Sequence, residues 1–264
     1  MVSVAPVYED RRVSIGRVFR RALSVIGKSP ALILGLALIF GGVPSLALRY
    51  IGSILIIGGP ANAESATIYR LLELLLVSLP LGIAVSSFVH AAITRATVSA
   101  IEGRTASFGE CLETALSVFL PIVAMSIVST IAVGLGLILF VVPGVVLYLI
   151  WSVALPALVI ERIGIFEALR RSAVLTKGAK WQILGISLVF VLTFWGLSLL
   201  LKTMGFQMYN PAQSSGVTTG NVIGGILQTA AILIAGGTLW TSLYLELRWW
   251  KDGESVHKLA EVFA

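Results

Sequence analysis

Charged side chains are scarce in this chain of 264 residues: they make up 12% of it, while 57% of the residues are hydrophobic. Soluble domains carry about one charged residue in four, so this composition excludes an ordinary soluble domain and indicates a membrane protein. Cysteine and histidine are rarer still, with Cys111, His90 and His257 as their only members. A lone cysteine excludes an internal disulfide, and these three residues lack the spacing of metal ligands. We therefore expect no metal and no cofactor.

The short motifs of common enzyme classes are also missing. The sequence contains no GxxxxGK[ST] phosphate-binding loop and no GxSxG nucleophile elbow. No paired nucleophile and base can be recognised either. The sequence therefore predicts a protein that is not an enzyme and has no catalytic residues.

Long uncharged runs are what the sequence does contain. They cover residues 29–48, 74–94, 114–160, 181–201 and 203–245. A membrane-spanning helix needs about 20 apolar residues, and the run 114–160 is interrupted at Pro143-Gly144. The fold class predicted is an all-α polytopic membrane protein, a single integral membrane domain over 1–264. Its six transmembrane helices are expected at about 30–48, 73–94, 117–140, 145–160, 181–201 and 222–245.

The distribution of lysine and arginine predicts the orientation. With the N-terminus inside, 16 of the 19 basic residues lie in inner segments, and Arg49, Arg70 and Lys202 lie outside. Basic residues favour the cytoplasmic side, so both termini are expected in the cytoplasm. The same rule accounts for the net charge of +6, and no nucleic-acid partner is expected.

Three similar segments precede the odd-numbered spans, at 15–25, 108–118 and 165–175. The first two share an Ala-Leu-Ser-Val run, and the first and third share an Arg-Arg pair. Polar residues recur in each at helical spacing, with apolar residues on the opposite side. We expect three cytoplasmic amphipathic helices in the interface, at 13–27, 106–117 and 164–177. Each would lead into a hairpin of two spans, giving three parallel repeats; the alternative is that any helix beside a membrane has this pattern.

The basic residues of these helices are the candidate site. Three interpretations stay open: a solvated loop on the positive side, contact with anionic lipid headgroups, or salt bridges from Glu110 and Glu113 to the arginine pairs of the first and third helices. Membrane lipids are the expected partners, and a protein partner or a homo-oligomer stays open. The candidate anionic-lipid contacts are Arg20, Arg21, Arg170, Arg171 and Lys177.

Other residues inside the spans are read mainly as structural. His90 is expected near the inner end of the second span, where packing or an interhelical hydrogen bond explains it better than a functional role. Pro44, Pro80 and Pro156 are expected to disturb their spans. Tyr and Trp residues near the presumed span ends, Tyr148, Trp151, Tyr244, Trp249 and Trp250 among them, are read as an interfacial belt.

A distinctive set of residues lies in 142–181, including Val142-Pro143-Gly144, Trp151-Ser152, Leu155-Pro156-Ala157, Glu167-Ala168-Leu169-Arg170-Arg171-Ser172, Leu175-Thr176-Lys177-Gly178 and Trp181. It resembles the most recognisable segment of the membrane domain fused to some bacterial glycerophosphoryl diester phosphodiesterases, and of related YciC-like inner-membrane proteins. The resemblance implies a bacterial inner-membrane location. Residues 148–151 depart from it, because they are uncharged where many members have a basic residue. The phosphodiesterase activity is not implied: its catalytic domain opens with His-Arg, whereas His90 precedes Ala91 and His257 precedes Lys258.

These observations predict a non-catalytic integral protein of the bacterial inner membrane. Its first expected role is an envelope scaffold or a lipid-associated module. The alternative is a small transporter or lipid translocator. One structural feature separates the two: a scaffold should have a packed apolar core, whereas a transporter should have a polar cavity within the membrane.

Overall fold

The computed structural model describes residues 13–47, 68, 72, 74–206 and 219–253. Every regular element within these ranges is a helix. Arg49, Arg70 and His257 lie outside the described residues.

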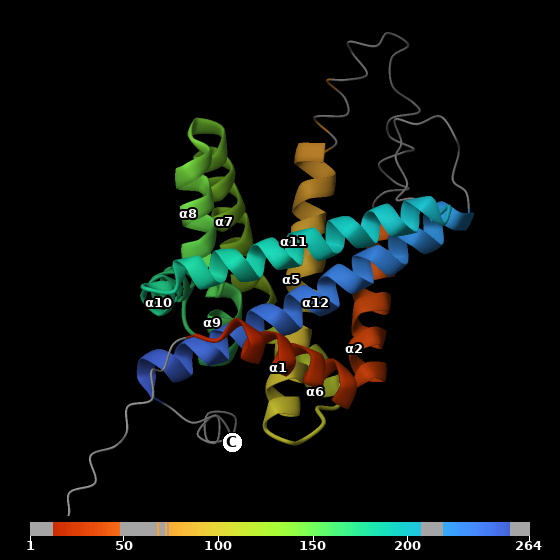
Figure 1. Ribbon diagram of the computed structural model, residues 1–264. Coiled ribbons are helices and arrows are strands. Elements are labelled where there is room, and N and C mark those ends of the chain that lie inside the picture. The colour runs from red at the N-terminus through yellow and green to blue at the C-terminus, as the bar shows by residue number, and fades with distance from the viewer. Residues whose placement is uncertain (1–12, 48–67, 69–71, 73, 207–218, 254–264) are drawn as a thin grey trace, which may run out of the picture.

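Within the described residues, six helical segments are long and apolar enough to cross a membrane, which agrees with the predicted number of spans and indicates a multi-pass membrane protein. These segments are Pro30–Ala47, Leu75–Ile101, Phe119–Leu139, Val141–Glu161, Lys180–Thr203 and Val222–Asp252. They are formed by α2 (Pro30–Ala37) with the π-helical turn η1 (Leu38–Gly42), η2 (Leu74–Ser78) with α5 (Leu79–Ile101), α7 (Phe119–Leu139), α8 (Val141–Trp151) with α9 (Ala154–Glu161), α11 (Lys180–Thr203) and α12 (Thr219–Asp252) (Figure 1).

Two helices continue beyond the predicted ends of their spans. The second was expected to stop before Arg95 and the sixth before Glu246, because a charge inside a span is costly. In the structure α5 continues to Ile101 and α12 to Asp252. Both charges have partners on neighbouring helices: Arg95 lies 3.5 Å from Glu110, and Glu246 lies 2.7 Å from Arg17. Pairing between helices thus keeps these charges inside helices that extend past the predicted ends of the spans.

The three prolines expected to disturb the spans each lie beside an irregularity. Pro44 follows the π-helical turn η1, and Pro80 follows η2. Pro156 lies in the first turn of α9, just after the break that separates α8 from α9. Proline lacks a backbone N–H and clashes with the preceding turn, so a widened turn or a new helix start accommodates it.

Three short helices precede the first, third and fifth of these long segments. They are α1 (Ile15–Lys28), α6 (Phe108–Ser117) and α10 (Ile165–Thr176). Each ends before the following span begins: at Ser29, at Val118, and in a turn where Gly178 has a φ of +92°. Each buries part of its apolar surface against the rest of the chain, with Val18, Cys111 and Ala168 fully covered, whereas Leu23, Leu116 and Phe166 are exposed.

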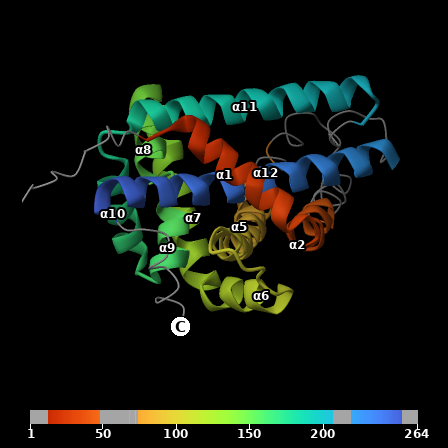
Figure 2. The ribbon, with the colours of Figure 1, turned by 60° about the horizontal axis from the view of Figure 1, so that its bottom comes forward.

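The helices pack in a cyclic order. Each short helix lies on the second long helix of another hairpin: α1 packs on α12, α6 on α5, and α10 on α8 and α9 (Figure 2). The first long helices follow the same order, since α2 packs on α12, α7 on α5, and α11 on α8. At the centre α5, α9 and α12 contact one another.

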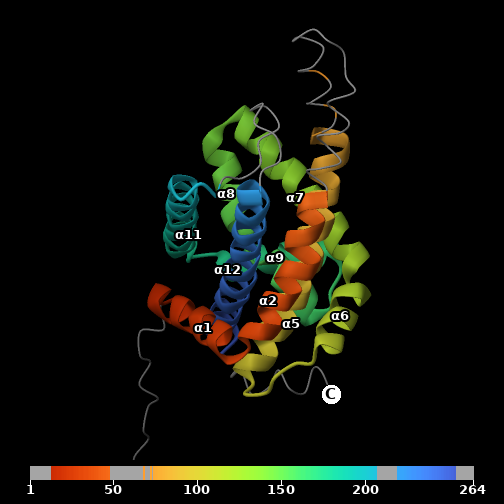
Figure 3. The ribbon, with the colours of Figure 1, turned by 90° about the vertical axis from the view of Figure 1, so that its right-hand side faces the viewer.

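The helix α11 buries few of its side chains, and those are Ile183, Ile186 and Ser187. It runs across the direction of the α7–α8 pair, and it lies on the side of the molecule opposite α6 (Figures 1 and 3). Its outward side chains are large and apolar, with Trp181 and Trp195 more than half exposed. Such a surface is suited to hydrocarbon rather than to water.

Candidate functional site

Two of the five predicted lipid-contact residues are held by ion pairs. Arg21 lies 3.5 Å from Glu246, and Arg171 donates to Glu161 over 2.9 Å and also to Asp252. Burial alone would lower the pKa of Arg171, but its hydrogen bonds to Asp252 and Glu161 outweigh burial and raise this pKa above its ordinary value. Both guanidinium groups therefore face protein carboxylates.

The other three predicted contacts lie on the surface. Arg20, Arg170 and Lys177 are exposed residues on α1, on α10 and just after α10. Arg20 and Arg21 are neighbours in sequence but lie on different sides of α1, because successive residues of a helix point about 100° apart. The structure thus divides the five residues into three that are available to headgroups and two that are paired within the protein.

The third interpretation of the interfacial charges is wrong for Glu110. This carboxylate lies 3.5 Å from Arg95 and 3.6 Å from Arg104, and not beside the arginine pairs of α1 or α10. The reason is the packing of α6, which lies on α5, where Arg95 is located. Glu113, on the same helix, is exposed.

Cys111 lies on the buried face of α6, with none of its surface exposed. Burial raises the pKa of this thiol to about 11, with a smaller opposing effect from Arg95. The thiolate is the reactive form, so at pH 7–9 the folded protein should present almost none of it.

We therefore expect Cys111 to resist alkylation by N-ethylmaleimide in native membranes over pH 7–9. The same thiol should react fully once the protein is unfolded in SDS, which mass spectrometry of the intact protein would measure. A folded protein with Ser117→Cys, which places a thiol on the exposed face of the same helix, provides the control and should react in native membranes. Complete native labelling of Cys111 itself would contradict the buried placement.

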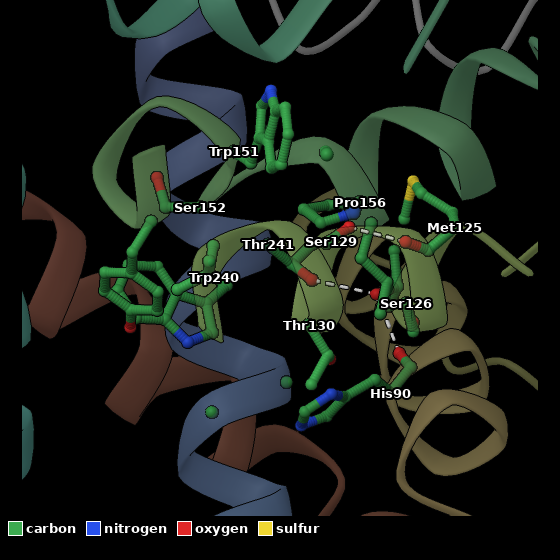
Figure 4. Close-up of a pocket in the computed structure, with 17 residues that line it drawn as sticks. His90, Met125, Ser126, Ser129, Thr130, Trp151, Ser152, Pro156, Trp240 and Thr241 are labelled. Carbon is green, nitrogen blue, oxygen red and sulfur yellow. Dashed lines mark hydrogen bonds between the residues drawn. The ribbon is translucent and has the colours of Figure 1, made fainter. Parts of the chain in front are cut away.

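A cavity of about 230 Å³ lies between α5, α7, α8, α9 and α12 (Figure 4). Its lining combines hydroxyl groups with aromatic rings, and none of the described residues that line it is Asp, Glu, Lys or Arg. The polar and aromatic members are His90, Thr94, Ser126, Ser129, Thr130, Tyr148, Trp151, Ser152, Trp240 and Thr241. Polar groups inside a membrane protein are costly unless they have partners or a functional reason, so this cavity is the candidate site.

On three sides of the cavity, hydroxyl groups already donate their protons in hydrogen bonds within the protein. Ser129 donates to the carbonyl of Met125, and Ser152 donates to the carbonyl of Leu149 over 2.9 Å. Thr94 donates to the carbonyl of His90 over 2.8 Å, so in its 3.1 Å contact with Thr241 the threonine at 241 is the donor. The lone pairs of Ser129, Ser152 and Thr241 remain able to accept hydrogen bonds.

Two other polar groups of the lining are able to donate a hydrogen bond as well as to accept one. Ser126 accepts from Ser87 over 2.9 Å, so its own proton can be donated. His90 Nε2 is buried and has no hydrogen-bond partner among the described residues. Gly236 lies beside it: a methyl carbon placed on Gly236 would be 3.3 Å from His90 Nε2. His90 therefore belongs to the cavity, and it lies near the middle of the helical segment Leu75–Ile101.

Aromatic rings form one side of the cavity. Tyr148 and Trp240 meet edge to face at 6.2 Å between ring centres, and Phe190 of α11 packs behind Trp240 at 6.3 Å. Trp151 lies at the other end of the lining from His90 (Figure 4). The interfacial-belt prediction is wrong for Tyr244, which is fully buried and donates to Glu161 over 2.6 Å.

The polar groups of the cavity can form hydrogen bonds with a ligand. Among the described residues of the lining, no hydroxyl group is hydrogen-bonded to the His90 ring. In the part of the chain that the structure describes, no group of three His, Cys, Asp or Glu side chains could hold a metal ion. The arrangement can enclose a small molecule and form several hydrogen bonds with it.

Sequence reasoning missed this cavity, although one signal was present. Ser126, Ser129 and Thr130 are spaced i, i+3 and i+4 in an otherwise apolar run, which places them on one side of α7. Such a polar stripe in a span indicates either contact between helices or a lined cavity.

Comparison of the chain with protein-family models, with curated proteins and with solved structures found no match. The resemblance described for residues 142–181 therefore rests on those residues alone.

Proposed function

We propose that this protein is a non-catalytic carrier of the bacterial inner membrane, a small transporter or a lipid translocator that binds its ligand between the spans. The observation that supports this role is the cavity of about 230 Å³ with its hydroxyl, imidazole and indole groups. An envelope scaffold would need only a packed apolar core at this place. The cavity thus favours the carrier over the scaffold.

The cyclic packing supports three helix-hairpin repeats. In each of the three junctions a short helix is ion-paired to the second long helix of another hairpin. Arg17 of α1 pairs with Glu246 of α12, Glu110 of α6 with Arg95 of α5, and Arg171 of α10 with Glu161 of α9. The cavity is lined by all three second helices, as a site between repeats would be.

The experiment that tests the carrier function measures what the cavity retains. Protein purified in nanodiscs formed directly from native membranes would be extracted, and its bound small molecules and lipids identified by mass spectrometry. Gly236→Ala should reduce the bound ligand severalfold, because the new methyl group would lie 3.3 Å from His90 Nε2.

The matched control is Gly196→Ala on α11, where a methyl group would meet nothing within 4 Å. This variant should retain as much ligand as the unchanged protein. A ligand content equal in both variants, or no bound molecule in the unchanged protein, would overturn the carrier function. Metal-dependent hydrolysis of glycerophosphodiesters that survived stringent purification would overturn the non-catalytic part of the proposal.

The proposed membrane topology, with six spans and both termini in the cytoplasm, leads to a separate prediction. Alkaline phosphatase fused after Ala63 or after Gly216 should be active, because phosphatase folds only outside the inner membrane. Fusions after Arg104, after Lys177 and at the C-terminus should be inactive there, and green fluorescent protein at the same sites should fluoresce. The physical reason is the excess of basic residues in the inner segments. An active phosphatase at the C-terminus would contradict the six-span orientation.

We also propose that Arg20, Arg170 and Lys177 contact anionic headgroups at the cytoplasmic surface. Their exposed side chains support this role, and each basic residue near an acidic leaflet contributes about 1 kcal/mol. A variant with all three residues changed to glutamine can be placed in nanodiscs rich in phosphatidylglycerol, and the amount of this lipid that it retains can be compared with that of the unchanged protein at low and high salt. The variant should retain less lipid at low salt, and high salt should remove the difference. Equal lipid retention at low salt would overturn this contact.

A further inference from the structure

We propose that the cavity binds an uncharged ligand rich in hydroxyl groups, either a free polyol or the headgroup of a neutral lipid. This inference rests on the proposed carrier function, because it names the class of molecule that the same cavity would take. Three properties of the lining lead to it: the lack of charge, the arrangement of hydrogen-bonding atoms, and the size with its aromatic side.

The first property is the absence of charge from the lining. Among the residues that the structure describes, no Asp, Glu, Lys or Arg lines the cavity, and the nearest charged neighbour in sequence, Arg95, is paired with Glu110. A charged ligand would leave water without meeting a counter-charge, which is strongly unfavourable inside a protein. Aromatic rings can attract a cation, but that attraction is weaker than the loss of hydration. The lining therefore favours a neutral molecule.

The second property is the mixture of acceptors and donors. Ser129 on α7, Ser152 after α8 and Thr241 on α12 offer lone pairs, because their protons are used within the protein. Ser126 and His90 can donate as well as accept. Because these acceptors lie on three separate elements, a ligand needs hydrogen-bond donors that point in several directions. Several hydroxyl groups on one carbon chain meet this requirement, since each of them both donates and accepts.

The third property is the size of the cavity and its aromatic side. An engineered apolar cavity of about 150 Å³ holds benzene, so about 230 Å³ accommodates roughly ten non-hydrogen atoms. The rings of Tyr148 and Trp240 offer an apolar surface for the C–H groups of the ligand. A molecule of the size of xylitol matches both features, and so does the glycerol end of a monoacylglycerol.

Binding to the full chain in nanodiscs tests this inference. The probes are xylitol as a free neutral polyol, monoolein in the bilayer as a neutral lipid, glycerol 3-phosphate as an anion and choline as a cation. Tryptophan fluorescence reports binding, because Trp151 and Trp240 line the cavity. We expect a saturable change with xylitol or with monoolein, and none with the charged probes; the neutral probe that binds identifies the source of the ligand.

The variant Ser129→Ala removes one acceptor and should weaken binding of that neutral probe about tenfold, the effect of one lost hydrogen bond. Ser129 donates only to a carbonyl of its own helix, so the fold should persist. The matched control is Ser86→Ala, which removes a similar bond, to the carbonyl of Ile83, outside the cavity lining.

Equal affinity in the two variants would overturn the inference. Binding of glycerol 3-phosphate or choline without either neutral probe would also overturn it and would leave the carrier function standing. If no probe binds, the inference falls, and the native ligand content of the Gly236→Ala and Gly196→Ala variants then decides the carrier function separately.

Discussion

Replacing Glu246 with lysine should cost the folded protein about 3–5 kcal/mol, the range for breaking a buried ion pair from one side. The side chain of Glu246 is 1% exposed, and its carboxylate lies 2.7 Å from Arg17 and 3.5 Å from Arg21. Lysine at this place would bring a third positive charge next to two arginines and away from water. The contact of α1 with α12 should then open, because the buried charge has no partner.

Thermal unfolding in a mild detergent, followed by loss of the monodisperse peak in size-exclusion chromatography, measures this effect. Adding Arg17→Glu to Glu246→Lys restores an opposite pair and should recover part of the loss. The control is Glu167→Lys on α10, which makes the same charge change at an exposed position. Glu246→Lys as stable as Glu167→Lys would contradict the importance of this ion pair.

The signs of the three junction charges also determine which helix packs where. The short helices α1 and α10 carry arginine toward a glutamate of α12 or α9, whereas α6 carries Glu110 toward Arg95 of α5. If α6 packed on α12 or α9 instead, its carboxylate would face another carboxylate. Like charges in a poorly solvated contact are unfavourable, so the reversed sign at this junction disfavours exchange of the three short helices.

The number and position of the spans could be predicted because a bilayer requires about 20 consecutive apolar residues, and the uncharged runs supply them. The ends could not be predicted where a charge is paired across helices. Arg95 and Glu246 were taken as ends of spans, and α5 and α12 continue past both. Their partners, Glu110 and Arg17, are far enough away in sequence that only the packing of α6 and α1 shows them.

The cavity could not be predicted from the sequence, because it exists only once the helices are packed together. It combines side chains from four spans, and serine or threonine in one span is compatible with lipid, with a neighbouring helix or with a site. The structural role predicted for His90 followed from its place near the charged end of the predicted span, where a histidine needs no special role. In the structure His90 lies near the middle of the helical segment Leu75–Ile101 and lines the cavity.

The roles of neighbouring basic residues could not be predicted from the sequence either, because they also depend on how the helices pack. The sequence treats Arg20 and Arg21, or Arg170 and Arg171, as equivalent pairs. In the structure the second member of each pair is ion-paired to another helix, and the first is exposed. Helical period separates the two members, but which side faces protein depends on the packing of α1 and α10.

Replacing Gly144 with alanine should damage the hairpin of α7 and α8 and the cavity beside it. A methyl carbon on Gly144 would lie 2.5 Å from the backbone nitrogen of Leu137 and 2.6 Å from its Cγ. A backbone atom cannot move aside as a side chain can, so the two helices must separate. Gly136 faces the same contact, since a methyl carbon there would lie 2.9 Å from Gly144 Cα. Such overpacking costs about 1–3 kcal/mol or more.

The matched control is Gly134→Ala on α7, where a methyl group would meet nothing within 4 Å. This change should be neutral or should stabilise the helix by about 0.5–1 kcal/mol, because alanine loses less backbone freedom on folding than glycine. Gly144→Ala should therefore unfold at a clearly lower temperature than Gly134→Ala. It should also lose bound ligand, because α8 carries Tyr148 and Trp151 into the cavity lining. Equal stability and equal ligand content in the two variants would show that α7 and α8 do not approach so closely in the membrane.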